Sequence, residues 1–323
     1  MPAAADTPRR RPSLWALQAR LAPYVFVAPF VLLFVGFMLY PLLRSLFLSV
    51  HKSAGPDELQ FIGMGNFTFL LRDQVFWWAV LNTLLFAGAF LLIQIPASML
   101  LAIVLNNPRV RFRNVFRFAF FSTHLVGSVF VAVIFNVLLG GRTGINQARS
   151  QIREALTAVA NSSGQGWLER LSPGVEPIGF LTDPSWTMPA ILTAALYLSV
   201  GYGMVYFLAA LQAVDKDLYE AADVDGASRW QQFVHVTLPG IRPVLLFLIL
   251  VGMIGALQLF ELPYVLFGGA GPNNRALTIV MYLFSNGFEQ GNLGYASAIG
   301  WALVVLVAAM SIIQLRLQRA SQT

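Results

Sequence analysis

Long stretches without a charged side chain are the feature that most constrains what this sequence folds into. No Asp, Glu, Lys or Arg occurs in residues 21–43, 74–108, 118–141, 184–214, 243–260 or 290–315. A charge at the centre of a bilayer costs about 3 kcal/mol or more, and a helix needs about 20 apolar residues to cross it. We therefore expect six membrane-spanning helices, at 22–45, 76–105, 115–139, 188–212, 243–267 and 294–315.

The composition supports an all-α polytopic membrane protein. Of the 323 residues, 57% are hydrophobic and only 11% are charged, whereas a soluble domain carries about 25% charged residues. The net charge of +6 comes from short basic clusters between apolar stretches, which is typical of membrane topology signals and not of a nucleic-acid groove. The chain has no cysteine and its three histidines lie far apart, so thiol chemistry is excluded and no metal site is expected.

The distribution of basic residues predicts the orientation of the chain. With both termini in the cytoplasm, 13 of the 21 Lys and Arg residues fall in cytoplasmic segments, as the positive-inside rule favours. The longest outer loop is then 140–187, in which apolar spacing predicts an amphipathic helix from Ile145 to Val159 that either packs on the bundle or binds an extracellular partner. The chain divides into a cytoplasmic tail (1–21), a first helix with its outer loop (22–75), a core (76–316) and a second tail (317–323).

One cytoplasmic loop, 213–243, has the pattern of a helix, a turn and a second short helix. Asp215 is placed to cap the first helix, and Gly226 allows a turn without a Cβ penalty. Trp230, Phe233 and Val234 form an apolar face of the second helix, and Pro239 with Pro243 is expected to end it and start the next span.

The first helix of the 213–243 loop presents a face of mostly small residues. Ala221, Ala222 and Asp225 follow Leu218 by three, four and seven residues, so all four lie on one helical face. Glu220 and Asp223 flank this face. Small side chains permit close approach by another surface, and the acidic rim suits a groove with basic or donor groups. From these residues alone, docking of a soluble partner and a merely solvated loop remain equal alternatives.

The same loop resembles a known signature. Glu220, Ala221 and Ala222, followed by Gly226, Leu238 and Pro239, match the EAA motif of ATP-binding cassette (ABC) importer permeases, and the surrounding residues 219–243 resemble the sugar-uptake branch. Further matches lie at 61–86, 112–121, 260–272 and 294–298, so the similarity covers about 22–316. The family usually has Phe-Asp where this chain has Phe260 and Glu261.

The resemblance implies a type I ABC importer permease fold and a division of labour among subunits. The implied partners are a second homologous permease subunit, two ABC ATPase subunits, an extracytoplasmic solute-binding protein and a carbohydrate substrate, which is a sugar, an oligosaccharide or glycerol phosphate. This chain has no P-loop motif, so it is expected to be a non-catalytic subunit without cofactors in a bacterial or archaeal cell membrane. The implied ATPase-coupling residues are Glu220, Ala221, Ala222, Asp225, Gly226, Leu238 and Pro239.

A second group of residues is the candidate substrate path. Glu261 follows Gln258 by three, so both can lie on one face of the fifth span. Glu261 is a sugar-hydroxyl acceptor, a hydrogen-bonding group inside the bundle or a residue of the outer interface, because intramembrane carboxylates usually face a cavity or a partner. The aromatic side chains either stack on sugar rings or simply pack. The complete candidate set is Tyr202, Tyr206, Gln258, Phe260, Glu261 and Tyr264.

Two other functions compete with ATP-driven import. An ion-coupled secondary transporter or channel needs a proton or sodium relay, for which one intramembrane carboxylate is thin support. An intramembrane enzyme would need a dyad such as Ser122 with His124, but residues two apart on a helix point to different faces.

Overall fold

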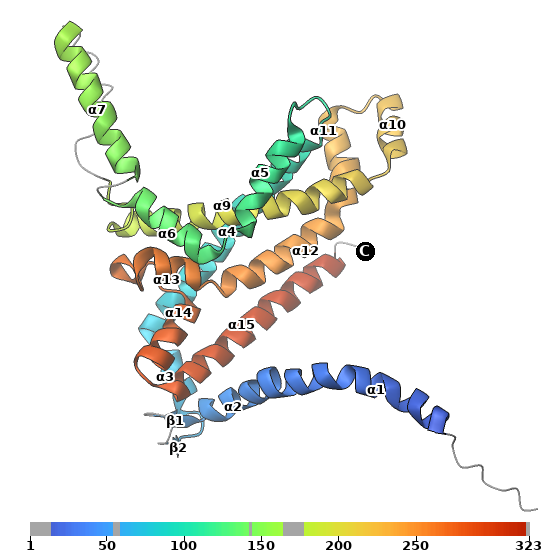
Figure 1. The fold of residues 1–323 in the computed structure, drawn as a ribbon, viewed down its shortest axis with the longest axis vertical. Helices are drawn as coiled ribbons and strands as arrows, with labels where there is room; N and C mark the ends of the chain where they lie inside the picture. Colours follow the sequence, from blue (N-terminus) through green and yellow to red (C-terminus); the bar gives the residue numbers. More distant parts are fainter. Residues whose placement is uncertain (1–13, 54–58, 142–143, 164–177, 321–323) are drawn as a thin grey trace, which may run out of the picture.

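The computed structural model describes residues 14–53, 59–141, 144–163 and 178–320, and the protein is built almost entirely of helices (Figure 1). Within these residues, six helical stretches are long and apolar enough to cross a membrane. They are Leu21–Ser49, Gln74–Asn106, Ser128–Ser162, Pro184–Ala213, Arg229–Leu257 and Leu293–Arg316. The only sheet in the described residues is a short antiparallel hairpin of β1 (His51–Ser53) and β2 (Leu59–Phe61).

Three predicted spans correspond closely to single helices. The second is α4 (Gln74–Asn106), the fourth is α9 (Pro184–Ala213) and the sixth is α15 (Leu293–Ala320). The first span is α1 (Leu14–Phe34) joined through a π-helical turn (Val35–Leu39) to α2 (Tyr40–Ser49), so helix begins ahead of the predicted residue 22. The amphipathic helix predicted at 145–159 is confirmed as α7 (Gly144–Ser163), while the rest of that loop, 164–177, lies outside the described residues.

The prediction of one continuous third span at 115–139 is wrong. The chain forms α5 (Arg113–Leu125) and α6 (Ser128–Leu139), separated by Val126 and Gly127 in extended conformations. Glycine has a low intrinsic helix propensity, and the β-branched valine before it is also a poor helix former. The break lies inside the charge-free run 118–141, so the positions of the charged residues do not reveal it.

The fifth predicted span, 243–267, is wrong at both ends. Helix α11 (Arg229–Gln232) runs through a π-helical turn (Phe233–Thr237) directly into α12 (Leu238–Leu257), so Pro239 does not stop the helix. Pro239 instead lies in the first turn of α12, where its missing N–H is tolerated, and the wider π turn precedes it. At the other end the chain breaks after Leu257 and resumes as α13 (Glu261–Phe267).

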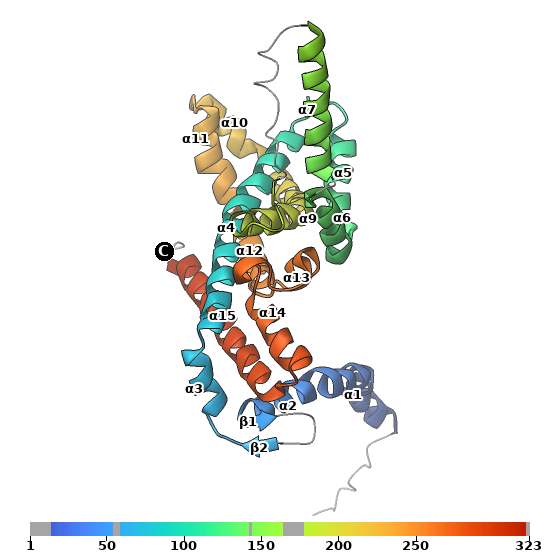
Figure 2. The same cartoon turned by 90° about the vertical axis from the view of Figure 1, so that its left-hand side faces the viewer.

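The remaining helices are short and cluster at the two ends of the bundle. They are α3 (Gly65–Arg72), α10 (Lys216–Val224), the 3-10 turn Pro272–Asn274, α14 (Ile279–Phe284) and the π turn Ser285–Glu289. Figure 2 shows α3 and the hairpin at one end of the long axis, and α10 with α11 toward the other. The start of α4 and the 213–243 loop therefore mark opposite ends of the molecule.

The core holds the two ends together through closely packed helices. Near the middle, one buried cluster joins α4, α6, α9, α12 and α13, and toward the 213–243 loop a second joins α4, α9 and α12. Among the described glycines, the tightest site is Gly201 of α9, where a Cβ atom would lie 1.8 Å from the carbonyl oxygen of Phe120 on α5. Small residues at such crossings let membrane helices approach.

Helix α1 leaves this core. In Figure 1, α1 and α15 diverge from the neighbourhood of the hairpin, although α2 packs against α15. Large apolar side chains of the first span are exposed to a high degree, with Phe26 at 83% and Phe37 at 80%. The first span is thus held to the rest of the chain at one end only.

A hydrogen-bonded carboxylate joins three helices at the end near the hairpin. Asp73 caps α4 by accepting from the backbone N–H of Val75, and its other oxygen accepts hydrogen bonds from the hydroxyls of Tyr282 and, at 2.5 Å, Tyr295. Burial raises the pKa of Asp73, but the hydrogen bonds outweigh it, so its pKa lies below the ordinary value of 3.8. Its contribution to stability is present above pH 3.8 and is lost as the pH falls through the lower, folded-state pKa.

We expect Asp73→Asn to lower the melting temperature at pH 7 by a few degrees. The change keeps a capping side chain but weakens two hydrogen bonds to a charged acceptor, a loss of about 1 kcal/mol for a partly exposed group. Asp183→Asn is the matched control, because Asp183 also caps a helix, α9, but within the described residues its side chain bonds only to Ser185. Thermal unfolding in detergent checks both variants, and equal melting temperatures for the two would contradict the role of the tyrosines.

Candidate functional site

The 213–243 loop folds as the sequence predicts up to Gly226. Asp215 caps α10 by accepting from the backbone N–H of Asp217 at 3.0 Å. Helix α10 ends at a turn in which Gly226 has φ of +73° and the N–H of Ala227 returns to the carbonyl of Ala222 at 2.9 Å. This left-handed residue is the reason for a glycine here, since a Cβ would add backbone strain.

Helix α10 is tied to the start of α12 by side chains that the sequence reasoning missed. The hydroxyl of Tyr219 bonds to Oγ1 of Thr237 at 2.9 Å, and the amide of Gln232 donates to Asp223 and to the carbonyl of Ala227. Ser228 forms a capping box at the start of α11 with the glutamine three residues later. That serine-to-glutamine spacing is a recognisable signal, whereas the bond between Tyr219 and Thr237 depends on the π turn and has no local signature.

The predicted coupling residues lie on the outside of this structure. Glu220, Ala221, Asp225 and Gly226 are exposed, and Ala222 is half-buried. Leu238 is half-buried and Pro239 exposed at the first turn of α12, so they lie at the base of the loop. Three apolar side chains of the loop are also exposed, Leu218 at 54%, Val224 at 88% and Trp230 at 71%. An acidic rim around exposed apolar groups is a surface that a partner can cover.

The breaks in the third and fifth spans meet at one point. The hydroxyl of Ser128, at the start of α6, donates to the carboxylate of Glu261, at the start of α13, and α6 packs against α13. Asn136 of α6 also donates to the carbonyl of Leu266 near the end of α13, at 2.8 Å. Non-helical backbone at membrane depth is tolerated where it is buried in protein or lines a cavity. Glu261 is itself exposed at this junction.

Gln258 and Glu261 do not share a helical face, contrary to the expectation from their spacing. Gln258 ends α12, Phe260 has a non-helical backbone, and Glu261 starts a new helix. At this break the hydroxyl of Thr278 donates a hydrogen bond to the backbone carbonyl of Leu259 at 2.7 Å, which gives that carbonyl a partner. Periodicity cannot be carried across a break, so the pairing of these two polar residues fails for that reason.

The predicted aromatic residues belong to two separate rows. Tyr202 lies between His124 and Tyr206, with ring centroids 4.5 Å and 4.7 Å away, and Tyr206 contacts Phe247. Phe260 stacks on Tyr264 at 5.2 Å, and the ring of Phe284 lies against both. The structure thus places Tyr202 and Tyr206 on one row and Phe260 and Tyr264 on the other, where Phe284 is a member that sequence reasoning missed.

Ser122 and His124 have different partners. The serine hydroxyl donates to the carbonyl of Ala119 in its own helix, and Nδ1 of His124 lies 3.1 Å from the carbonyl of Leu198. The two side chains therefore make no dyad, and His124 takes the hydrogen-bonded packing position.

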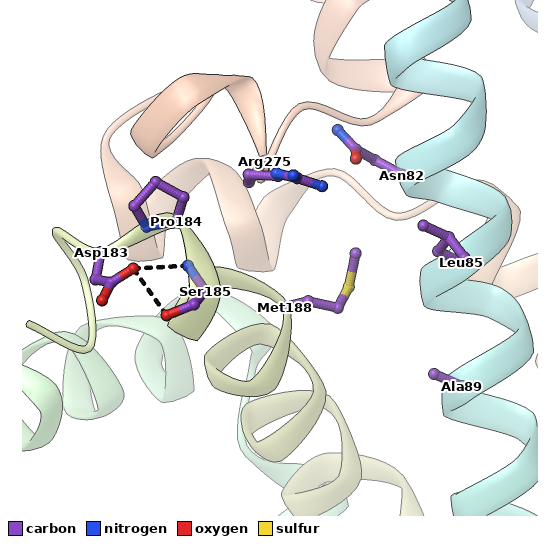
Figure 3. A pocket seen from close by; sticks show the side chains of 8 residues that line it. All are labelled: Asn82, Leu85, Ala89, Asp183, Pro184, Ser185, Met188 and Arg275. Atoms are coloured by element: carbon purple, nitrogen blue, oxygen red, sulfur yellow. Dashed lines mark hydrogen bonds between the residues drawn. The ribbon is translucent and has the colours of Figure 1, made fainter.

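A cavity between α4 and α9 contains none of the predicted site residues. It has a volume of about 650 Å³ and lies between α4, the start of α9 and Arg275. In Figure 3, Leu85 and Ala89 of α4 lie across the cavity from Met188, and Arg275 also lines the cavity. The lining is largely apolar, and the amide of Asn82 is already bonded to the carbonyls of Asn274 and Leu277. Asp183 likewise uses its carboxylate to cap α9.

Comparison with known proteins places the whole chain beside importer permeases. It is 36% identical over 298 residues to the arabinooligosaccharides transport system permease protein AraP of Bacillus subtilis (strain 168), covering 92% of this chain and 88% of that protein. It is also 36% identical over 295 residues to the lactose transport system permease protein LacF of Rhizobium radiobacter, covering 90% and 92%.

The fold matches that of a solved transporter. A chain in the crystal structure of a bacterial ABC transporter involved in the import of the acidic polysaccharide alginate superposes with a TM-score of 0.77 at 25% identity, covering 95% of this chain and 98% of that one. A second structure of a bacterial alginate ABC transporter, in complex with an alginate pentasaccharide-bound periplasmic protein, gives a TM-score of 0.76.

The family model described as binding-protein-dependent transport system inner membrane component matches residues 94–322, which include the 213–243 loop and the helix breaks of the third and fifth spans. Together with the six membrane-length helices, this match assigns the chain: it belongs to the inner membrane components of binding-protein-dependent transport systems, the permeases of ABC importers.

Proposed function

We propose that this chain is one of two permease subunits in an ATP-driven importer of a carbohydrate, with both of its termini in the cytoplasm. The observation that carries the proposal is the exposed α10, tied by Tyr219 to Thr237 at the base of a membrane-length helix. Relatives named for arabinooligosaccharides and lactose support a sugar or an oligosaccharide, more than glycerol phosphate, as the substrate.

Helix α10 acts as a lever in this proposal. One of the two ABC ATPase subunits binds the exposed residues Glu220, Ala221 and Asp225, and the ATP-dependent closure of the ATPase pair moves α10 as a rigid piece. Because Tyr219 and Gln232 attach α10 to the segment that continues into α12, the movement reaches the membrane helices. Gly226 permits the turn, and Leu238 and Pro239 form the base from which the lever projects.

The first span supports the presence of a second homologous permease. Its apolar side chains are exposed along most of its length, and α1 contacts its own chain at one end only, so this surface is free for another subunit to cover. A second subunit covers part of this surface, and lipid covers the rest. An extracytoplasmic solute-binding protein then delivers the carbohydrate to the end opposite the 213–243 loop.

The substrate path runs past the junction of the two broken helices. Discontinuous helices are a common way of placing polar groups at a transport site. Ser128 and Glu261 supply a hydroxyl and a carboxylate there, and Gln258 adds an exposed amide. The rows containing Tyr202 with Tyr206, and Phe260 with Tyr264, supply ring faces on which a sugar can stack.

Reconstitution tests this proposal directly. The chain is purified with its ATPase, second permease and binding protein, which are sought among the neighbouring genes. Uptake of radiolabelled lactose, arabinotriose, maltotriose, trehalose and raffinose into vesicles is then measured. We expect uptake of at least one neutral sugar that requires both ATP and the binding protein. Uptake driven by a proton or sodium gradient without an ATPase would instead support a secondary transporter and overturn the proposal.

A further inference from the structure

A second, smaller cavity lies at the end of the bundle opposite the 213–243 loop. It has a volume of about 280 Å³ and is bounded by Val75 at the start of α4, by α13 and by α14 with its following π turn. This volume is close to the lower end of known ligand pockets. Its polar lining groups are Tyr264, Asn274, Tyr282, Ser285 and Glu289. We call it the Glu289 cavity.

The carboxylate of Glu289 is available to a ligand. Glu289 is exposed, and in the described part of the chain its side chain accepts one hydrogen bond, from the hydroxyl of Tyr264 at 3.3 Å. This distance exceeds the usual 2.5–3.0 Å of a good O–H···O bond, so the bond is weak. A ligand hydroxyl can replace it, which leaves the Tyr264 hydroxyl free to bond to the same ligand.

An aromatic wall continues from the same residue. Tyr264 stacks on Phe260 with 25° between the ring planes, and Phe284 meets Tyr264 edge-on at 5.4 Å. Sugars combine an apolar face of C–H groups with a rim of hydroxyls. A ring face next to carboxylate, amide and hydroxyl groups matches that combination, as in sites where a few polar groups orient a ligand in a largely apolar pocket.

Among the described residues that line the Glu289 cavity, Glu289 is the only charged one. Asp73, which accepts a hydrogen bond from the lining residue Tyr282, adds a second carboxylate beside the cavity. Arg275 follows the lining residue Asn274 in the chain but lines the neighbouring cavities instead. A uronate ligand would bring a third negative charge into this region, which like-charge repulsion disfavours. The larger cavity of Figure 3 offers Arg275 instead but no aromatic ring, and Asn82 and Asp183 there already use their side chains.

We infer that the Glu289 cavity is an outer saccharide subsite that selects neutral over acidic sugars, with Glu289 accepting sugar hydroxyls and Tyr264 both donating to and stacking on the ring. The inference rests on the proposed function, because the cavity lies where an importer receives its ligand. A preference for neutral sugars would distinguish this chain from the transporter of similar fold, which is involved in the import of the acidic polysaccharide alginate.

The inference is tested by asking whether a bound sugar protects a single introduced cysteine from chemical labelling. The chain has no cysteine of its own, so no native cysteine has to be replaced first. Ser285→Cys places a thiol in the cavity, and Thr68→Cys on the exposed surface of α3 is the matched control. The reconstituted complex without ATP is labelled with a membrane-impermeant maleimide in the presence of each neutral sugar of the uptake panel or of mannuronate trisaccharide.

We expect the imported neutral sugar to slow labelling at position 285 and not at 68, and mannuronate trisaccharide to protect neither. Adding Glu289→Gln to Ser285→Cys should raise the protecting concentration about tenfold, as loss of a hydrogen bond to a charged group does. Equal protection by mannuronate, or no protection at 285 by a sugar that the same complex imports, overturns the inference and leaves the proposed function standing. Failure to import any sugar counts against the proposed function instead.

Discussion

Replacing Gly226 by Asp is expected to abolish ATP-driven uptake while the permease still folds. Gly226 has φ of +73°, a region that costs a residue with a side chain about 1–2 kcal/mol. No atom lies within 4 Å of where its Cβ would be, so the variant meets no steric obstacle within the chain. The added carboxylate instead stands at the exposed turn of α10, on the surface proposed to meet the ATPase.

Two measurements separate docking from folding in this variant. The amount of monodisperse permease extracted from membranes should match that of the native chain, and ATPase co-purification should be lost. Gly226→Asn serves as the control, because asparagine has the same shape without the charge and tolerates a left-handed backbone. We expect it to retain measurable uptake. If Gly226→Asp takes up the sugar at the native rate, the 213–243 loop does not couple the permease to the ATPase.

Replacing Gly201 by Val is expected to remove most of the folded permease from the membrane. The Cβ of any other residue would lie 1.8 Å from the backbone oxygen of Phe120, and a backbone atom cannot move aside as a flexible side chain can. Separating α9 from α5 should cost about 3 kcal/mol or more, the upper range for overpacked cores. The loss is measured by size-exclusion chromatography of a fluorescently tagged chain.

Gly88→Val is the matched control for Gly201→Val. Gly88 lies in the membrane-length helix α4, and nothing lies within 4 Å of its Cβ position. The same glycine-to-valine change should leave the folded fraction within about twofold of the native chain. If both variants express equally well, the tight crossing of α5 and α9 does not limit folding.

The sequence predicts those features that depend on composition over many residues. The cost of burying a charge locates α4, α9 and α15 to within a few residues, and capping by Asp215 with a turn at Gly226 locates α10. These rules act on single helices in any surroundings, so no knowledge of the neighbouring helices is needed.

Features that depend on a second helix were not predictable. The break at Val126 and Gly127 lies inside the charge-free run 118–141, and the one between Leu257 and Glu261 lies at the end of the charge-free run 243–260. Partners far along the chain complete them, as with Ser128 and Glu261. Proline was equally ambiguous, since Pro239 suits a helix stop or a first turn, and the structure uses it as the latter. The Glu289 cavity also combines segments that no local pattern connects.

Crosslinking from α10 tests the central claim most directly. Ala221→Cys puts the only thiol of the chain on the exposed face of that helix, and Thr68→Cys at the other end of the molecule reports non-specific reaction. In the assembled, transport-active complex, a short thiol-reactive photocrosslinker at position 221 should join the permease to the ATPase subunit, and at position 68 it should not. A transporting complex in which position 221 joins to no ATPase would contradict the account.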